Sequence, residues 1–211
     1  MEFGVGIVLA ALGAYLLGSI PTAVWIGKSF YGIDVREHGS GNAGATNALR
    51  VLGNKVGIVV LLLDALKGVA AVSLALLVQE KFQSPDLFVL FQLVLGALAL
   101  TGHVYPVFAS FRGGKGIATL AGIITILLPL AVLICLGVFL LVFIPTRYVS
   151  LGSLSAALAF PVAVIWILDI NLLPVIVFSI MVAIFVVLTH LKNIKRLLHG
   201  RENKISFRKK A

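Results

Sequence analysis

The chain contains 211 residues, of which 60% are hydrophobic and 12% are charged, and its formal net charge is +9. Soluble domains carry about 25% charged residues, so this composition excludes an ordinary soluble protein and predicts an integral membrane protein. The single cysteine, Cys135, excludes a disulfide within the chain. The sequence also has no Cys/His cluster that could hold zinc.

Seven apolar segments follow one another along the chain, each suited to a membrane-embedded helix. We therefore predict an all-α, polytopic membrane protein with a single domain over residues 1–211. The predicted segments are 7–27, 56–79, 87–105, 117–128, 130–146, 151–168 and 172–190.

The stretch 117–146 can be interpreted as one long helix or as two short ones. As one helix it would be about 45 Å long at ~1.5 Å per residue, too long for a hydrocarbon core of about 30 Å without strong tilt. Proline suits the first turn of a helix. We therefore expect a break near Leu128 and Pro129.

The distribution of positive charge predicts the topology. With seven segments, 15 of the 17 Lys and Arg residues fall on one side of the membrane. Cationic residues collect on the cytoplasmic side, so we expect the N-terminus outside and the basic tail 191–211 in the cytoplasm. Six segments would place Arg147 and the tail outside. The polar loops 28–55, 106–116 and 147–150 then face the cytoplasm, and topology explains the charge without nucleic acid as a partner.

The first polar loop contains the run GSGNAGATNALRVLGNK over residues 39–55. Glycines relieve steric limits on turns and let backbone amides approach an anion. A short helix is expected to begin near Thr46, with free amides at its N-terminus. We interpret the run as part of a site for phosphate-bearing anions; the alternative is a loop whose polar groups satisfy one another. Its candidate residues are Ser40, Asn42, Thr46, Asn47 and Arg50.

A second polar run, GHVYPVFASFRGGKG, occupies residues 102–116 and precedes an apolar helix. Glycines and a lysine at a helix start are suited to holding a phosphate, although P-loop spacing is absent. The alternative is a positively charged stop at the membrane edge. His103 is expected to be a structural hydrogen-bonding group rather than a base. The candidate residues are Arg112, Gly113, Gly114 and Lys115.

Asp64 and Lys67 stand three residues apart inside an apolar segment. Charges within a bilayer are expensive and normally paired, and residues three apart share a helical face. We therefore predict a structural ion pair, and leave open whether the pair touches a substrate.

Two further polar groups lie at the ends of the later segments. Ser150 and Ser153 share a helical face close to Arg147, and His190 and Asn193 have the same spacing. Either group can line a cleft. For the second group the alternative is a membrane anchor, which fits the neighbouring cations better than it fits His190 and Asn193.

Four motifs together resemble a known family. SGNAGATNALR, GHVYPVFASFRGGKG, RYVSLGS and the pattern HxxNIxRLLxGxE ending at Glu202 are similar to those of the bacterial acyl-phosphate:glycerol-3-phosphate acyltransferases of the PlsY type. The resemblance covers nearly the whole chain. It departs from the family at Leu191, where the family has arginine, and at Arg112, where lysine is the commoner residue.

The resemblance implies a specific activity. Such enzymes move a fatty acyl group from acyl phosphate to the sn-1 hydroxyl of glycerol 3-phosphate, which gives lysophosphatidic acid and phosphate in the first acylation of bacterial phospholipid synthesis. They need no metal or cofactor. The implied partners are the two substrates, membrane lipid and the enzyme that makes acyl phosphate. The implied location is the bacterial inner membrane, with the active site at the cytoplasmic face.

The resemblance also assigns residues by motif. The catalytic set that it implies is Ser40, Arg50, Lys115, Ser153, His190 and Asn193. The substrate- and phosphate-binding set is Asn42, Thr46, Asn47, Arg112, Gly113, Gly114, Arg147 and Ser150.

Three mechanisms and two other functions stay open at this stage. The sequence has no Ser-His-Asp arrangement and no His-x4-Asp motif, so we expect substrate assistance, in which the donor's phosphate takes the hydroxyl proton. His190 as general base is the rival, and His103 is a weaker one. An organic-anion transporter or channel is the main alternative function, because broken helices and glycine-rich loops serve such proteins too. A structural partner of a lipid-synthesis complex is a third interpretation.

Overall fold

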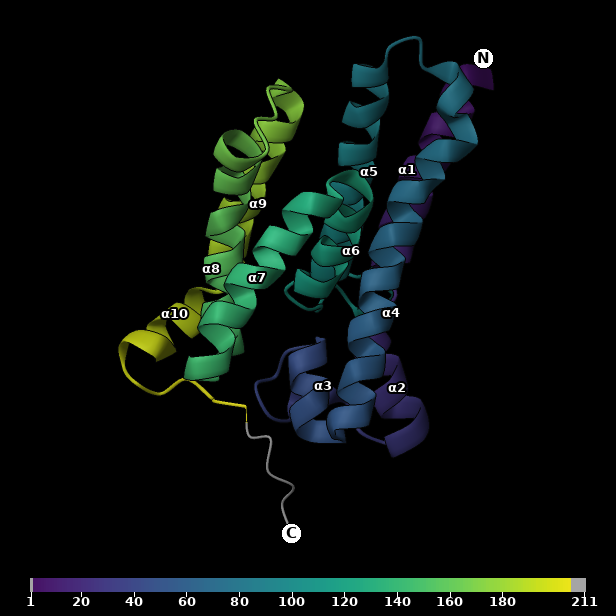
Figure 1. Ribbon diagram of the computed structural model, residues 1–211. Helices are drawn as coiled ribbons and strands as arrows, with labels where there is room; N and C mark the ends of the chain where they lie inside the picture. The colour runs from purple at the N-terminus through teal and green to yellow at the C-terminus, as the bar shows by residue number, and fades with distance from the viewer. Residues whose placement is uncertain (1, 206–211) are drawn as a thin grey trace. The chain divides into compact units, whose positions relative to one another are not determined.

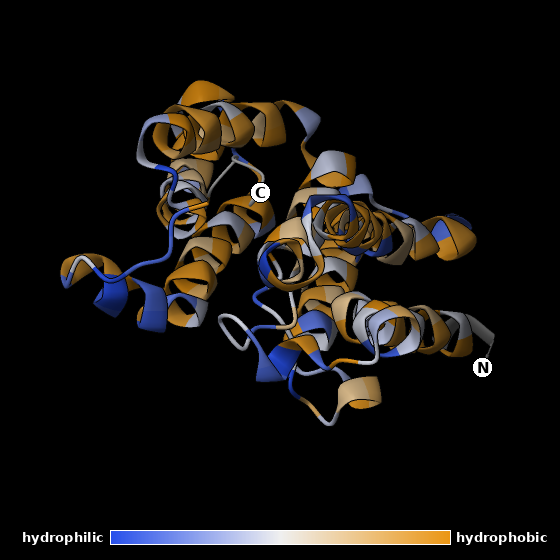
Figure 2. Ribbon diagram, turned by 90° about the horizontal axis from the view of Figure 1, so that it is seen from below, coloured by the Kyte–Doolittle hydropathy of each residue, from blue (hydrophilic) through white to orange (hydrophobic). Residues whose placement is uncertain are grey.

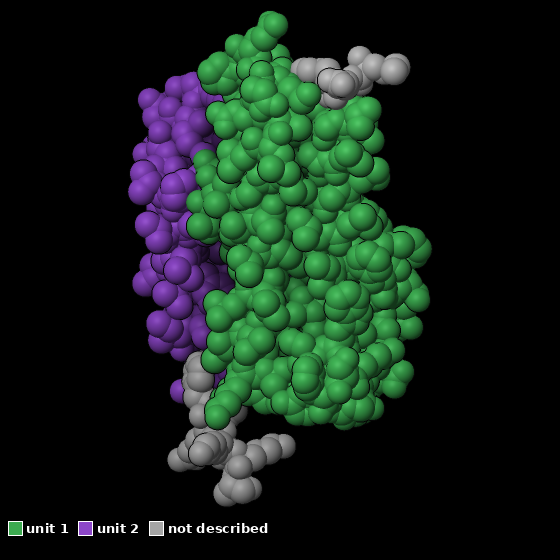
Figure 3. All heavy atoms as spheres, turned by 90° about the vertical axis from the view of Figure 1, so that its right-hand side faces the viewer, with its two compact units in different colours: residues 1–127 green, residues 128–211 purple. Residues whose placement is uncertain are grey.

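The computed structural model describes residues 2–205, which form helices joined by turns and loops without a strand among them. The predicted all-α fold is confirmed over this range. The chain divides into two compact units, Met1–Leu127 and Leu128–Ala211, which are coloured separately in Figure 3.

Unit 1 contains four apolar helices and a shorter helical region at one end of them. In Figure 1, α1, α4, α5 and α6 run side by side, and α2 and α3 lie together at the end away from the α4–α5 connection. Its α-helices are α1 (Glu2–Gly18), α2 (Thr22–Tyr31), α3 (Ala45–Leu52), α4 (Asn54–Ser73), α5 (Pro85–Val104) and α6 (Ile117–Leu127). Its 3-10 helices are η1 (Val35–Glu37), η2 (Leu74–Lys81) and η3 (Val107–Ala109).

Unit 2 is a group of three apolar helices followed by a short polar one. Helix α8 packs against both α7 and α9, and α10 lies at the end of α9 (Figure 1). Figure 2 shows α10 and the segment after it mostly blue and the apolar helices mostly orange. The elements are α7 (Pro129–Thr146), α8 (Val149–Val162), the π-helix η4 (Ala163–Ile167), α9 (Leu173–Thr189) and α10 (Leu191–Leu198).

Length and composition identify the helices that can cross a membrane. Within the described residues four helices satisfy both criteria, and six do so if each bent pair counts as one span. The pairs are α1 with α2 and α9 with α10, and α6 is a shorter apolar helix. Each of the seven predicted segments therefore falls mainly on helical residues, while the number that cross the membrane stays a prediction.

The predicted break near Leu128 is confirmed. Helix α6 ends at Leu127, and α7 begins at Pro129. Leu128 has φ −145° and ψ 68°, outside the helical region. Since proline has no N–H to donate, it fits the first turn of α7, where that group would have no intrahelical partner.

The prediction of one continuous helix over 7–27 is wrong. Helix α1 ends at Gly18, α2 begins at Thr22, and the two axes are bent by 48°. Pro21 cannot donate a backbone hydrogen bond, so a helix cannot continue through it unperturbed. Side chains from α4 compensate at the break: Lys67 Nζ donates to the carbonyl oxygen of Ile20 at 2.8 Å.

The predicted tail 191–211 begins with a helix that the sequence analysis did not assign. Helix α10 is bent by 61° from α9, and His190, with φ −105° and ψ 7°, occupies the bend. Cationic residues cover one face of α10, whereas Leu191 and Leu198 are 55% and 81% exposed. Such an amphipathic helix is typical of a membrane interface. Residues 206–211 of the predicted tail lie outside the described residues.

Glycines allow α4 and α6 to approach each other closely. A Cβ added to Gly68 would collide with the carbonyl oxygen of Thr119, and one added to Gly122 would collide with that of Ala65. Small residues have this use in membrane proteins, where close packing of helices replaces the hydrophobic driving force. The α4–α6 contact therefore depends on the missing side chains at Gly68 and Gly122.

Gly122→Ala is expected to destabilise the protein, because the new methyl group must push α6 away from the α4 backbone. Overpacking of this kind costs about 1–3 kcal/mol, which corresponds to a fall of about 5 °C in the melting temperature. The measurement is thermal unfolding of the detergent-solubilised protein. Gly137→Ala in α7 is the matched control, since a Cβ there meets nothing within 4 Å. Equal melting temperatures for the two variants would contradict the close-packing argument.

Candidate active site

Asp64 lies at the centre of a buried polar network in unit 1. Its carboxylate is 2% exposed, and Oδ1 accepts hydrogen bonds from Thr22 Oγ1 and from Lys67 Nζ, both at 2.9 Å. The predicted ion pair is confirmed. Because Lys67 also donates to Ile20, the pair connects α4 to the break between α1 and α2, and we interpret its role as structural.

The same network reaches the second polar run through His103. The imidazole is 6% exposed, and its Nδ1 lies 3.0 Å from Thr119 Oγ1 and 3.9 Å from Asp64 Oδ1. A Cβ at Gly114 would collide with Nε2 of this ring. Enclosure on all these sides supports the expected structural role for His103.

Gly113 and Gly114 pack directly on the end of α5. Their amides donate to the carbonyl oxygens of Val104 and His103, each at 3.1 Å. These two carbonyls are acceptors that the helix end would otherwise leave unsatisfied. The expectation that the glycine amides receive a phosphate therefore fails in this conformation. The two glycines let the loop approach α5, and they deliver Arg112, which is exposed, and Lys115, which is half-buried.

Asn47 organises the first polar run. It is 1% exposed, and its Oδ1 accepts hydrogen bonds from the amide of Ser40 at 2.7 Å and from Ser40 Oγ at 3.0 Å. Its Nδ2 donates to the carbonyl oxygens of Val35 at 2.7 Å and His38 at 3.1 Å. Gly39 has φ +63°, in the left-handed region, and a Cβ there would collide with Asn47 Oδ1. Asn47 thus holds Ser40 in place.

The remaining predicted residues of this run lie on or beside α3. The helix begins at Ala45, one residue before the predicted start, and Gly44 supplies the first carbonyl acceptor, for the amides of Asn47 and Ala48. Asn42, Thr46 and Arg50 are each half-buried, Arg50 in the last turn of α3. The spacing of Thr46 and Arg50 places them one turn apart on the helix.

Glu202 accepts hydrogen bonds from two of the predicted site residues of unit 2. Its side chain is 4% exposed, and its Oε1 accepts hydrogen bonds from Asn193 Nδ2 at 2.7 Å and from Ser150 Oγ at 3.0 Å. Its Oε2 lies 3.0 Å from Arg196 Nε. A single carboxylate therefore orients one residue of α8 and two of α10. Ser153, one turn after Ser150 on α8, is 4% exposed.

His190 is held by the backbone at the junction of α9 and α10. The ring is 2% exposed, and its Nδ1 lies 2.8 Å from the carbonyl oxygen of Val186 and 3.3 Å from Thr189 Oγ1. A carbonyl can only accept, so Nδ1 carries the proton in this contact and Nε2 is the basic nitrogen of the neutral ring. His190 and Asn193 are also joined through the backbone, because the amide of Asn193 donates to the carbonyl of His190 at 2.8 Å.

Arg147 shapes the corner between α7 and α8. It has φ +62° and caps α7, and its amide donates to the carbonyl of Phe143 at 2.7 Å. Its own carbonyl accepts a hydrogen bond from the amide of Ile205 at 3.0 Å. The segment after α10 therefore returns to this corner, where Lys204 lies over the ring of Tyr148.

The predicted site residues thus fall into two groups, one in each unit. The sequence analysis missed three residues that organise these groups. Glu202 was visible as a lone acid that ends the last motif, but no role was assigned to it. Asp34 and Arg36, just before the first polar run, are an acid and a base two residues apart, and no motif singled them out. Within residues 2–205 no group of three or more His, Cys, Asp or Glu side chains could hold a metal ion.

A comparison with models of protein families identifies the family of this chain. The model of a family described as glycerol-3-phosphate acyltransferase matches residues 8–200. The chain belongs to this glycerol-3-phosphate acyltransferase family. The resemblance found in the four motifs is therefore confirmed.

Curated members of the glycerol-3-phosphate acyltransferase family match nearly the full chain. The glycerol-3-phosphate acyltransferase of Geobacillus kaustophilus is 46% identical over 199 residues, which cover 94% of this chain and 96% of the relative. That of Chlorobaculum tepidum is 43% identical over 227 residues, which cover 93% and 95%.

Two solved structures share the fold of this acyltransferase. The crystal structure of PlsY (YgiH), an integral membrane glycerol 3-phosphate acyltransferase, in its glycerol 3-phosphate form has a TM-score of 0.85 and 36% identity, and the match covers 95% of this chain and 96% of that one. The lysophosphatidic acid form has a TM-score of 0.81 and 34% identity, with 95% of each chain covered. This chain is accordingly a multi-pass membrane protein of the acyltransferase family.

Lys67→Met is expected to destabilise this acyltransferase strongly, because it leaves the Asp64 carboxylate buried without its cation. Breaking a buried ion pair costs about 3–5 kcal/mol, or a fall of about 10 °C in melting temperature. Adding Asp64→Asn to the same chain should recover much of the loss. The measurement is thermal unfolding in detergent, with Lys55→Met, an exposed lysine of the same helix, as control. A single variant as stable as the double variant would refute the structural role of the pair.

Proposed function

We propose that this membrane glycerol-3-phosphate acyltransferase takes its acyl group from acyl phosphate and places it on the sn-1 hydroxyl of glycerol 3-phosphate. The products would be lysophosphatidic acid and phosphate, in the first acylation of bacterial phospholipid synthesis. The observation that carries the proposal is the match, over 95% of the chain, to an integral membrane enzyme solved in its glycerol 3-phosphate form. The four acyl-phosphate-type motifs support the choice of donor.

The location of the site follows from the substrates and the charge distribution. Both substrates are anions, and one has an acyl chain that only the bilayer can solvate. We place the site at the cytoplasmic face of the bacterial inner membrane, with the N-terminus outside, seven membrane-embedded segments and the C-terminal segment in the cytoplasm. The amphipathic α10 supports an interfacial position for that end of unit 2. In this proposal all 211 residues serve a single acyltransferase domain.

The proposed roles use the charges and hydrogen-bonding groups already described. Arg50 binds a substrate phosphate as a fork and Lys115 binds one as a point charge. Ser40 and Asn193 orient glycerol 3-phosphate together with Ser153. Ser40 donates its hydroxyl proton to Asn47, so its oxygen can accept a hydrogen bond from a substrate hydroxyl. Asn193 donates through Nδ2 to Glu202, which fixes the orientation of its side-chain amide.

The other predicted residues have supporting roles in the proposal. Asn47 and Ser150 hold their neighbours, as their hydrogen bonds suggest. Gly113 and Gly114 place Lys115 by packing on α5 rather than by donating their amides to phosphate. The residues that we propose to surround the substrates at longer range are Asn42, Thr46, Arg112 and Arg147.

The chemical step needs little help beyond positioning, since acyl phosphate is already activated. The sn-1 hydroxyl oxygen attacks the acyl carbonyl carbon, and the bond between that carbon and the phosphate oxygen breaks. The departing phosphate keeps the bonding electrons and takes the hydroxyl proton, so that no protein base is required. In this proposal the buried His190 ring, whose Nδ1 is held by the Val186 carbonyl, has a positioning role.

Wild-type protein in lipid is expected to form lysophosphatidic acid from palmitoyl phosphate and glycerol 3-phosphate, without added metal. Palmitoyl-CoA and palmitoyl carrier protein, offered separately, should give none. The measurement is product formation together with phosphate release, which should require glycerol 3-phosphate. Product from either other donor would contradict the proposed donor. No product from any donor, with uptake of an organic anion into vesicles, would replace the enzyme by the transporter alternative.

His190→Gln is expected to lower kcat by about tenfold or less and to leave the shape of the pH–rate profile unchanged. A general base contributes about 100- to 10,000-fold, and its loss would also change the shape of the pH–rate profile. The measurement is steady-state kinetics between about pH 5.5 and about pH 8, with His199→Gln as control, an exposed histidine at the end of α10. A loss of several orders of magnitude for His190→Gln alone would exclude substrate assistance as the whole mechanism.

A further inference from the structure

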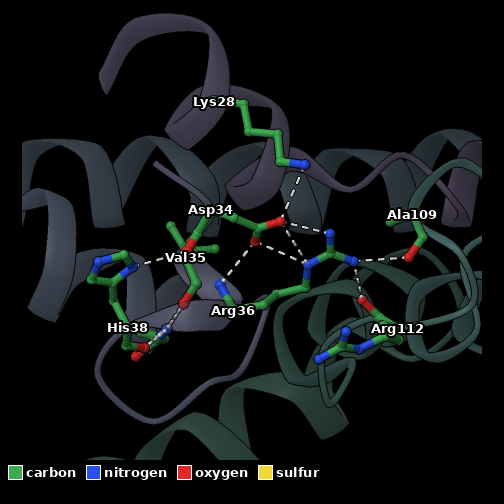
Figure 4. A network of polar contacts seen from close by, with 8 residues as sticks. Lys28, Asp34, Val35, Arg36, His38, Ala109 and Arg112 are labelled. Atoms are coloured by element: carbon green, nitrogen blue, oxygen red, sulfur yellow. Dashed lines mark hydrogen bonds and ion pairs between the residues drawn. The ribbon is translucent and has the colours of Figure 1, made fainter. Parts of the chain in front are cut away.

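Arg36 joins the two polar loops of unit 1. It lies in η1, just before the first polar run, and its guanidinium points away from that loop toward the second one (Figure 4). Its NH1 donates to the carbonyl oxygens of Ala109 at 2.8 Å and of Arg112 at 3.3 Å. The side chain is 14% exposed. An arginine that is largely buried and bonded to backbone carbonyls fixes the position of the backbone that it contacts.

The backbone that Arg36 contacts has an unusual conformation. Ser110 and Phe111 lie between the two carbonyls, and their φ angles are +54° and +58°. Residues other than glycine rarely adopt such angles, and each costs about 1–3 kcal/mol unless the surroundings impose it. Neither side chain is buried, so side-chain packing does not impose the turn. Backbone hydrogen bonds close the turn from within, from the amide of Phe111 to the carbonyl of Pro106 at 2.9 Å and from that of Arg112 to Ala109 at 3.2 Å. The hydrogen bonds from Arg36 tie it on both sides to the first polar loop.

Asp34 aims the guanidinium. Its Oδ1 accepts from Arg36 Nε at 3.0 Å, and its Oδ2 accepts from NH2 at 2.7 Å. The amide of Arg36 also donates to Oδ1 at 3.0 Å, and Lys28 Nζ lies 3.2 Å from Oδ2. Hydrogen bonds from Arg36 hold the pKa of the Asp34 carboxyl well below its usual range. The carboxylate therefore stays charged near neutral pH, and the fork leaves NH1 free to reach the second loop.

Each loop that Arg36 connects carries a residue of the proposed site. Asn47 ties Ser40 to the carbonyl of Val35, the residue before Arg36. On the other side, Arg112 is three residues before Lys115. The hydrogen bonds from Ser40 to Asn47 and from Asn47 to Val35 are thus joined, through the peptide bond between Val35 and Arg36, to the hydrogen bonds that Arg36 makes with the turn before Lys115.

We propose that Arg36 is a positioning residue for acyl transfer. It holds the turn at Ser110 and Phe111, and thereby places Lys115 to bind a substrate phosphate while Ser40 orients glycerol 3-phosphate. Asp34 is its orienting partner. The role of Lys115 in this inference rests on the proposed function. The hydrogen bonds by which Arg36 connects the two loops do not depend on that function.

The first test measures the bridge without reference to activity. In Arg36→Met, amide hydrogen exchange over residues 107–112 is expected to become at least about tenfold faster in the detergent-solubilised protein, because the turn loses its anchor. The matched control is Lys28→Met, which removes a cation from Asp34 but touches neither carbonyl. If Arg36→Met does not fold, Arg36→Lys replaces it, since a lysine keeps the charge but lacks the fork. Unchanged exchange in the folded variant would overturn the inference.

The second test measures positioning through Lys115. Arg36→Met is expected to lower kcat/KM for lysophosphatidic acid formation by about 100-fold, and Lys28→Met to leave it unchanged. In a Lys115→Met background the same Arg36 change should cost less than about threefold, because residues that act through one another are not additive. A role in general stability would instead give the same factor in both backgrounds, and that result would overturn the proposal.

The two tests separate the possible failures. A wild-type protein that forms no product would refute the proposed function, while the exchange comparison would still decide whether Arg36 holds the turn. An active wild type with additive Arg36 and Lys115 effects would refute the positioning role alone.

Discussion

The need to satisfy backbone polar groups inside a bilayer governs this structure. Lipid offers no hydrogen bonds, so a chain that interrupts a helix at membrane depth must supply partners from its own side chains. At the break over Ser19–Pro21, Lys67 donates to the backbone carbonyl of Ile20, and its partner Asp64 accepts from the side-chain hydroxyl of Thr22. The ion pair therefore stabilises the bend between α1 and α2. The direction of α2 and of the loop after it depends on that bend.

A second feature of the molecule is that its polar loops are held by individual side chains rather than by a large apolar core. Asn47, Arg36 and Glu202 each make several hydrogen bonds to neighbouring loops or helices. Such hubs give a unique geometry from few atoms, because an amide, guanidinium or carboxylate fixes both distance and direction. They also have the weakness that removing a single residue leaves several buried groups without partners. In a small membrane protein, where helices supply most of the packing, this is an economical way to build precise loops.

The sequence predicted most of the helices, and it predicted less of what holds the loops. Hydropathy and the position of Pro129 were sufficient for the α6–α7 break, and spacing alone identified the Asp64–Lys67 pair. The bend at Pro21 was missed because the apolar composition continues through it. The engagement of the Gly113 and Gly114 amides by α5 could not be read from a local pattern, because the acceptors belong to residues 103 and 104, at the end of another helix. Arg36 and Glu202 escaped for the same reason: their roles depend on partners as far as 76 and 52 residues away.

The place of Glu202 in the chain has a consequence for biosynthesis. Ser150 and Asn193 precede it by 52 and nine residues. Ile205, whose amide donates to the carbonyl of Arg147, comes later still. During translation α7, α8 and α9 are synthesised before this carboxylate, so at that stage the polar end of unit 2 lacks the group that joins its residues. Assembly of that end must wait until Glu202 has left the ribosome. A chain cut short before Glu202 would lack the group that orients Ser150, Asn193 and Arg196.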